Sequence, residues 1–147
     1  MAKFLTDIEG KATNTEVTYT ISTLAGKIVP QIKQDGSITV DMGKPILSVA
    51  DVPTTLAPTR EGAAVSAPIS AAGTEYKVTA VSMGNPHAVI FVNDLENMEP
   101  SFVTVGPLME KHSAFPARVN AEFVQVLSRS HVKVKVWERG AGALRIA

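Results

Sequence analysis

The sequence predicts an α+β fold built from antiparallel or mixed β-sheets. Short stretches that alternate apolar and polar residues recur along most of the chain, and this period of two is typical of half-buried strands. Helical spacing is confined to two short stretches, residues 2–8 and 105–112. Strands do not alternate regularly with long helices, so the pattern does not favour a doubly wound parallel sheet.

The first part of the chain predicts one helix followed by short strands. Phe4, Leu5 and Ile8 fall on one face of the helix. The sequence Gln34-Asp35-Gly36 predicts a hairpin turn. Pro30 indicates an edge strand or a bulge, because proline has no N–H to donate to a neighbour. The strands expected here are residues 15–23, 28–33 and 37–42.

The second part of the chain predicts longer strands and a short helix. Ala88–Val92 is continuously apolar, which suits a strand buried on both faces. In the last strand, valines at 132, 134 and 136 are expected to point inward and the lysines between them outward. Pro107 suits the first turn of the helix at 105–112. The expected strands are residues 75–83, 88–92, 118–128 and 130–137.

A proline-rich stretch weakens the strand pattern between residues 43 and 72. We therefore expect two domains, residues 1–73 and 74–147, with the boundary near Gly73.

Composition excludes several classes of function. The 147 residues carry no formal net charge and no run of basic residues, so they do not predict binding to nucleic acid or to an anionic membrane. The start lacks a signal peptide, and no apolar run is long enough to span a membrane, so a cytoplasmic location is expected. There is no cysteine, and the three histidines lack metal-ligand spacing. Neither a metal site nor a nucleotide-binding loop is predicted.

Five polar residues stand at predicted strand ends and are the candidate site residues. They are Asn85, His87, Asn120, Glu138 and Arg139. Arginine can bind a carboxylate through two hydrogen bonds, and a glutamate beside it can accept from an ammonium group. The glycines of Gly140-Ala141-Gly142 would let backbone N–H groups approach an anion. Each residue also has a plainer interpretation, as a turn residue, a core histidine or a surface ion pair.

Four stretches together resemble the diaminopimelate epimerase family, in order and spacing, from Lys3 to Gly142. They are Val81-Ser82-Met83-Gly84-Asn85-Pro86-His87, Val105-Gly106-Pro107-Leu108 with Glu110-Lys111-His112, Phe115-Pro116-Ala117-Arg118-Val119-Asn120-Ala121-Glu122-Phe123-Val124 and Val136-Trp137-Glu138-Arg139-Gly140-Ala141-Gly142. Two further stretches, Val40-Asp41-Met42-Gly43 and Ser128-Arg129-Ser130-His131, are most similar to the plant and cyanobacterial branch.

The resemblance implies two similar halves, each a mixed sheet curled around a central helix. It implies the interconversion of LL- and meso-diaminopimelate in lysine biosynthesis, without a cofactor. One cysteine thiolate would remove the α-proton, and a second cysteine thiol would protonate the opposite face. The partner would be this small molecule, and the full-length family would form a homodimer. The compartment would be the cytoplasm, or the plastid stroma in a photosynthetic eukaryote.

The resemblance also assigns roles to the five candidates. Asn85, Asn120, Glu138 and Arg139 match positions that hold the distal amino-acid end of the substrate. His87 and Glu138 match positions that tune the two catalytic thiols.

The chain departs from the family pattern at both catalytic cysteines, which its sequence does not contain. We therefore expect an internal fragment of an epimerase that is truncated at both ends and inactive alone. Two alternatives remain open at this stage: a cysteine-free isomerase of the phenazine-pathway type, and a non-catalytic remnant that binds an amino acid.

Overall fold

The computed structural model describes residues 2–9, 16–23 and 26–144. The chain forms two compact units, Met1–Lys44 and Pro45–Ala147. The expected boundary at Gly73 lies in the turn between β6 (Ala67–Ala71) and β7 (Thr74–Ser82), inside the second unit. The proline-rich segment before β6 belongs to that unit because it bonds to the sheet, where Ile46 and Ser82 form a bridge. Whether the family's halves divide at 73 stays a prediction.

The described residues of the first unit form one helix and two small antiparallel sheets, in the strand orders β1-β4-β5 and β2-β3. The β4–β5 hairpin turns at Gly36, which has a φ of +80°, and Lys33 N–H donates to the Ser37 carbonyl. The hairpin prediction is confirmed. Its elements are α1 (Ala2–Ile8), β1 (Val17–Thr18), β2 (Ile21–Thr23), β3 (Gly26–Ile28), β4 (Pro30–Ile32) and β5 (Ile38–Val40).

Helix α1 spans the residues predicted for it, whereas the expectation for Pro30 is wrong in detail. Pro30 lies in the central strand rather than at an edge, but at its first position, where the strand tolerates a missing N–H. Helix α1 buries Thr6, while Phe4 and Ile8 are exposed. The helix contacts β4 through the face that carries Thr6, and the Tyr19 hydroxyl donates to the Thr6 hydroxyl over 3.3 Å.

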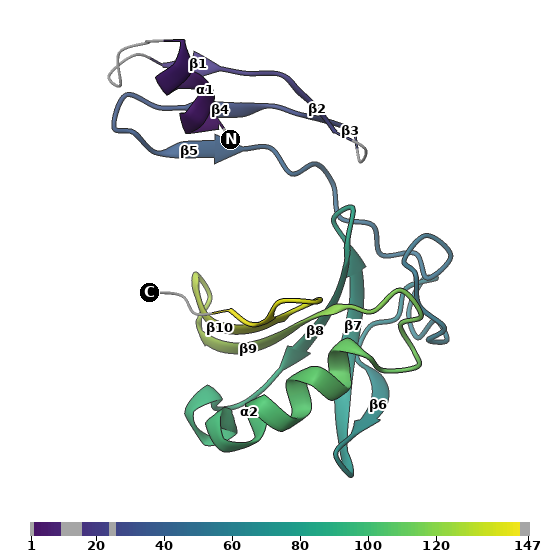
Figure 1. Cartoon of the computed structure of the whole chain (residues 1–147). Helices are drawn as coiled ribbons and strands as arrows, with labels where there is room; N and C mark the ends of the chain where they lie inside the picture. The colour runs from purple at the N-terminus through teal and green to yellow at the C-terminus, as the bar shows by residue number, and fades with distance from the viewer. Residues whose placement is uncertain (1, 10–15, 24–25, 145–147) are drawn as a thin grey trace. The chain divides into compact units, whose positions relative to one another are not determined.

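The second unit is a six-stranded sheet in the order β11-β10-β9-β8-β7-β6, with helix α2 lying along one face (Figure 1). Strands β8 and β9 run parallel, and the other neighbours are antiparallel. The predicted α+β class with a mixed sheet is confirmed. Its further elements are β8 (Pro86–Phe91), α2 (Leu95–Glu110), β9 (Asn120–Ser128), β10 (His131–Glu138) and β11 (Gly142–Ala143).

Helix α2 is longer than the sequence pattern predicts, because it begins at Leu95 rather than at Val105. Asp94 caps it, and its carboxylate accepts hydrogen bonds from the Glu96 and Asn97 N–H groups. Pro100 and Pro107 both lie inside the helix. Prolines interrupt the helical bonding without ending the helix, since burial of its apolar face stabilises it.

The core lies between α2 and one face of the sheet. On that face β10 presents Lys133 and Lys135, which pair with Glu96 and Glu99 of α2. The expectation for β10 is therefore wrong: lysines cover the helix side, with Lys135 above the Phe102 ring at 5.6 Å. The largest fully buried side chains of the core are those of Phe115, Phe123, Ile90, Leu95, Met109, Val52, Val78, Val105 and Val119.

The opposite face of the sheet carries polar side chains and apolar side chains that are only partly buried. Val132 there is 49% exposed and Phe91 is 63% exposed. The prediction that the strand at Ala88–Val92 is buried on both faces is wrong, because Ala88 and Ile90 are buried while Val89 and Phe91 are not.

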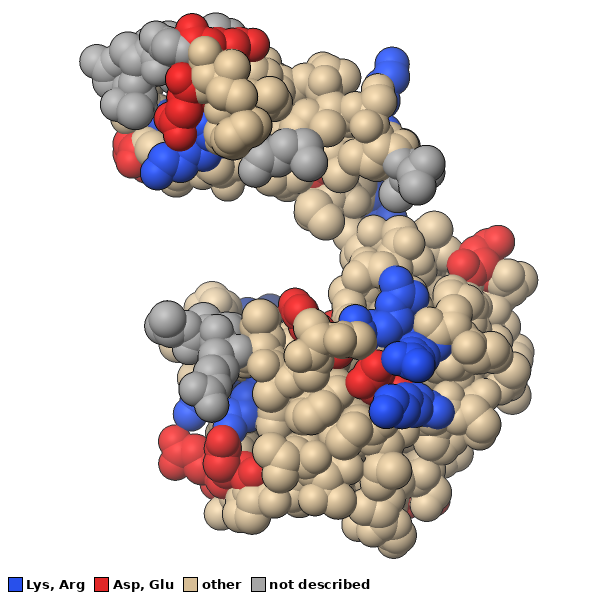
Figure 2. Space-filling model, in the orientation of Figure 1, with Lys and Arg blue, Asp and Glu red and all other residues tan. Residues whose placement is uncertain are grey.

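Charged side chains are dispersed on the molecular face drawn in Figure 2, where small groups of both signs interrupt an uncharged surface. This agrees with the zero net charge of the chain. Among the described residues, no helix has the length and hydropathy needed to cross a membrane.

Candidate active-site edge

The sheet topology brings the five candidate residues to one edge of the second unit. Strands β8 and β9 are parallel neighbours, and His87 lies opposite Asn120 near the start of both. Strand β10 is antiparallel to β9, and it ends at Glu138 beside the start of β9. Asn85 precedes β8 in the turn after β7. We call this edge, with Asn85, His87, Asn120, Glu138 and Arg139, the polar edge.

Arg139 is fixed in place by the strand next to it. Its backbone N–H donates to Asn120 Oδ1 over 2.8 Å, and its guanidinium donates to the Ala117 carbonyl over 3.2 Å. Because the Asn120 oxygen is engaged by a backbone donor, the Asn120 amide NH₂ is left to face other partners. Arg139 is exposed and Glu138 is half-buried. Within the described residues, no hydrogen bond or ion pair occupies the Glu138 carboxylate.

The turn after Glu138 is stabilised by hydrogen bonds to Glu110, the last residue of α2. Glu110 accepts from the Trp137 indole N–H over 2.9 Å and from the Gly140 N–H over 3.0 Å, and Arg118 lies 3.5 Å away. The Trp137 hydrogen bond is the main reason that the pKa of Glu110 lies below its ordinary value, against the opposing effect of burial.

The sequence suggested that the Gly140 N–H could bind an external anion, but the structure does not place it so. This N–H binds the chain's own Glu110 carboxylate. Gly140 has a φ of +81°, a left-handed conformation that glycine adopts without strain. The glycine serves to turn the chain and so to present Glu138 and Arg139 at the polar edge.

His87 lies between Glu122 of β9 and Asn85 of the polar edge. Its Nδ1 is 2.6 Å from Glu122 Oε1, and its Nε2 is 2.9 Å from Asn85 Oδ1. Glu122 and Asn120 are two positions apart in β9, so they project from the same face of the sheet. The other carboxylate oxygen, Glu122 Oε2, is buried and has no hydrogen-bond partner among the described residues.

The arrangement suits a ligand that carries a carboxylate and an ammonium group together. Asn120 and Arg139 supply hydrogen-bond donors to an anion, and Glu138 supplies an acceptor for a cation. Donor and acceptor groups lie on adjacent strand ends, so a single amino-acid head group could reach both.

Glu110 and Glu122 were not predicted from the sequence as site residues. Glu122 had a usable signal, because it follows the candidate Asn120 at the spacing that puts two strand residues on one face. The sequence signal for Glu110 was weaker. An acidic residue in the last turn of a helix interacts unfavourably with the helix dipole, so hydrogen-bond donors are expected near it.

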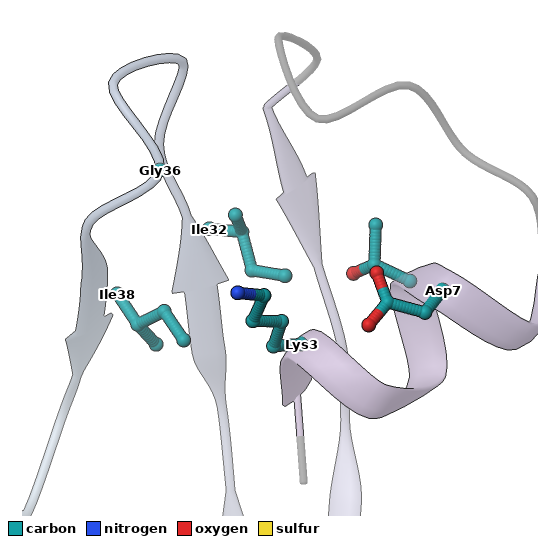
Figure 3. A pocket seen from close by; sticks show the side chains of 6 residues that line it. Lys3, Asp7, Ile32, Gly36 and Ile38 are labelled. Atoms are coloured by element: carbon teal, nitrogen blue, oxygen red, sulfur yellow. The ribbon is translucent and has the colours of Figure 1, made fainter.

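The described residues contain no cluster of three or more histidine, aspartate or glutamate side chains that could hold a metal ion. A separate pocket of about 190 Å³ lies in the first unit, between α1 and the β4–β5 hairpin (Figure 3). Lys3 and Asp7 of α1 and the apolar side chains of Ile32 and Ile38 line it. It contains none of the five candidates and is mostly apolar, so it adds nothing to the polar edge.

Comparison with known proteins gives one consistent family. The family model described as diaminopimelate epimerase matches residues 79–145, which include the whole polar edge. The chain is 49% identical over 144 residues to a diaminopimelate epimerase of Acaryochloris marina, and 47% identical over 142 residues to one of Nostoc punctiforme. It is 47% identical over 153 residues to a chloroplastic diaminopimelate epimerase of Oryza sativa.

These alignments cover 97% of this chain but only part of each relative. The covered share is 49% of the Acaryochloris protein, 50% of the Nostoc protein and 41% of the rice protein. The chain thus spans about half the length of the bacterial relatives it matches.

Proposed function

The chain belongs to the diaminopimelate epimerase family, and we propose that its polar edge binds the distal amino-acid head of diaminopimelate. In this proposal Arg139, Asn85 and Asn120 donate to the distal carboxylate, and Glu138 accepts from the distal ammonium. The observation that carries it is the convergence of these four residues and His87 at the ends of adjacent strands.

The proposed reaction of the whole protein is the cofactor-independent inversion of one α-carbon of diaminopimelate in lysine biosynthesis. One base removes the α-proton and an acid on the opposite face returns one, so no net proton is gained or lost. The resemblance assigns both tasks to cysteine thiols, with His87 and Glu138 tuning them. The 147 residues contain no cysteine, so this chain alone should bind without catalysing the inversion.

The wider setting is proposed on the same basis. The family's two-half organisation, with a division near residue 73, and its homodimer would apply to the full-length protein. The compartment would be the cytoplasm, or the plastid stroma if the source is a photosynthetic eukaryote, and the similarity to a chloroplastic relative supports the second option.

Binding can be tested by calorimetric titration of the purified chain with meso-diaminopimelate. Arg139→Gln should weaken binding by about ten-fold or more, because a charged hydrogen bond to a carboxylate is lost. Arg129→Gln is the matched control, since Arg129 is an exposed arginine in the β9–β10 turn, away from the polar edge. Equal losses in both variants, or no binding by the unchanged chain, would refute the distal-head assignment.

Catalysis can be tested separately through the α-proton. LL-diaminopimelate in deuterated buffer should exchange its α-proton at the buffer rate when this chain is present, because both thiols are missing. Exchange well above that rate would show that other groups of this chain move the proton, and it would favour the cysteine-free alternative.

A further inference from the structure

We propose that Glu122 is a positioning residue that acts through His87 to set the orientation of the Asn85 amide. In this orientation Asn85 turns its oxygen toward His87 and its NH₂ group toward a carboxylate of the ligand. Glu122 would therefore help the polar edge to select an anionic group. This inference rests on the proposed function for the identity of the ligand, but the Glu122–His87–Asn85 chain itself does not depend on it.

The first step is the contact between Glu122 and His87. The distance of 2.6 Å between Glu122 Oε1 and His87 Nδ1 requires a shared proton, since two lone pairs would repel each other. The Glu122 side chain is 15% exposed and His87 is 22% exposed, so the pair is partly screened from water. Because Glu122 Oε2 is buried without a partner among the described residues, His87 is the group that compensates this carboxyl.

The second step is the contact between His87 and Asn85. Asn85 Oδ1 lies 2.9 Å from His87 Nε2. An amide oxygen only accepts hydrogen bonds, so Nε2 must carry a proton and donate it. The ring then has a proton at Nε2 and a second one shared between Nδ1 and Glu122. With its oxygen engaged, the Asn85 amide can meet a ligand only through its NH₂ donors.

The third step is that the Asn120 amide is engaged in the same way as the Asn85 amide. The Asn120 amide has its oxygen engaged by the Arg139 N–H, so its NH₂ group is likewise available for donation. Two amides of the polar edge thus have their oxygens engaged within the chain and keep their NH₂ groups for donation. This pattern of donors fits a carboxylate and disfavours a ligand group that can only donate.

The ring nitrogens of His87 give a test that needs no ligand. Nitrogen-15 NMR of the full chain should show Nε2 of His87 protonated, and the Nδ1 proton should resonate far downfield because it lies in a short hydrogen bond. Glu122→Ala should abolish that downfield signal, whereas Glu75→Ala, at an exposed position of β7, should leave it unchanged. An unprotonated Nε2 in the unchanged chain would overturn the proposal, and so would a downfield signal that survives Glu122→Ala.

Ligand selection gives a second test with a different readout. L-lysine has the amine of the distal end of diaminopimelate but lacks its carboxylate, so the ratio of the two affinities reports on carboxylate recognition. Glu122→Ala should weaken the binding of diaminopimelate about ten-fold and leave the binding of lysine unchanged. Glu75→Ala should not alter the ratio.

A double-substitution cycle identifies the route of the effect. If Glu122 acts through His87, Glu122→Ala and His87→Phe should reduce the preference for diaminopimelate over lysine by the same factor. The double variant should then lose no more of this preference than either single variant. Additive losses would overturn the proposal. A chain that binds neither compound would refute the proposed function, and the ring measurement would then decide on Glu122 alone.

Discussion

The carboxylate of Glu110 joins the end of α2, the Trp137 indole and the turn at Gly140. Its side chain is 5% exposed, so removing the carboxylate would leave a cavity and take the acceptor away from the partly buried hydrogen bonds of Trp137 and Gly140. At the scale of the residue, this one acid therefore supports the position of Glu138 and Arg139 without touching a ligand. Its contribution should appear in stability and in its dependence on pH.

Glu110→Ala should lower the free energy of unfolding by about 3 kcal/mol at neutral pH, since two partly buried hydrogen bonds to a charged acceptor are lost and a cavity replaces the buried side chain. Urea unfolding followed by Trp137 fluorescence measures the loss. Glu75→Ala, an exposed strand substitution, should change the free energy by less than about 0.5 kcal/mol. A loss for Glu110→Ala no larger than that of the control would contradict the role.

The same residue should make stability depend on pH. Because the pKa of Glu110 is lowered from 4.5 on folding, the unfolded chain binds the proton more tightly than the folded chain. The stabilisation is complete above pH 4.5 and is lost as the pH falls below that value toward the folded pKa. Glu110→Gln should flatten this part of the unfolding profile, while Glu75→Gln should leave its slope intact.

Helix α2 and strand β10 meet at an unusually close contact. A methyl group built at Gly106 would lie 2.5 Å from the Trp137 ring, far inside van der Waals distance. Trp137 also packs edge-on against Phe102, with 5.8 Å between ring centroids. At the scale of the element, glycine is required here by the approach of a neighbouring ring rather than by its backbone conformation.

Gly106→Ala should therefore destabilise the second unit by about 2 kcal/mol, although alanine favours helix by about 1 kcal/mol over glycine. Thermal unfolding would measure the change. Val103→Ala tests an exposed position of the same helix, and it should cost less than about 0.5 kcal/mol. Combining Gly106→Ala with Trp137→Leu should cost less than the sum of the two single losses, because the clash is removed. A stabilising effect of Gly106→Ala would contradict the contact.

The two units differ in how much apolar surface they bury. The main hydrophobic cluster runs from Val52 to Phe123, with Trp137 packed against it, and so lies entirely in the second unit. In the described part of the first unit, the buried apolar residues are Val17, Pro30 and Ile32. At the scale of the whole molecule, stability should be concentrated in the second unit.

Residues 45–147 expressed alone should keep the fold of the second unit, because its core contains no residue of the first. Amide resonances of β7 to β10 should overlay on those of the full chain. Native-state hydrogen exchange of the full chain should show faster opening in β1–β5 than in β7–β9. Collapse of the shorter chain, or equal protection in both units, would contradict this division.

The sequence alone determined the α+β class, the hairpin at Gly36 and the resemblance to one family, because alternation, turn residues and motif spacing are local properties of the chain. It also named Asn85, His87, Asn120, Glu138 and Arg139 as candidates. It misjudged the start of α2, because the burial that stabilises the first turns of the helix depends on distant residues and not on the local pattern.

Only the tertiary structure decided which groups act together. The parallel pairing of β8 with β9 placed Glu122 against His87, and the packing of α2 placed Glu110 under Gly140. The packing of α2 also explains why the lysines of β10 face the helix, because Glu96 and Glu99 of α2 form ion pairs with them. Each of these contacts joins residues far apart in the chain, and the pairing of strands and helix that creates them follows from burial of the whole core rather than from any one segment.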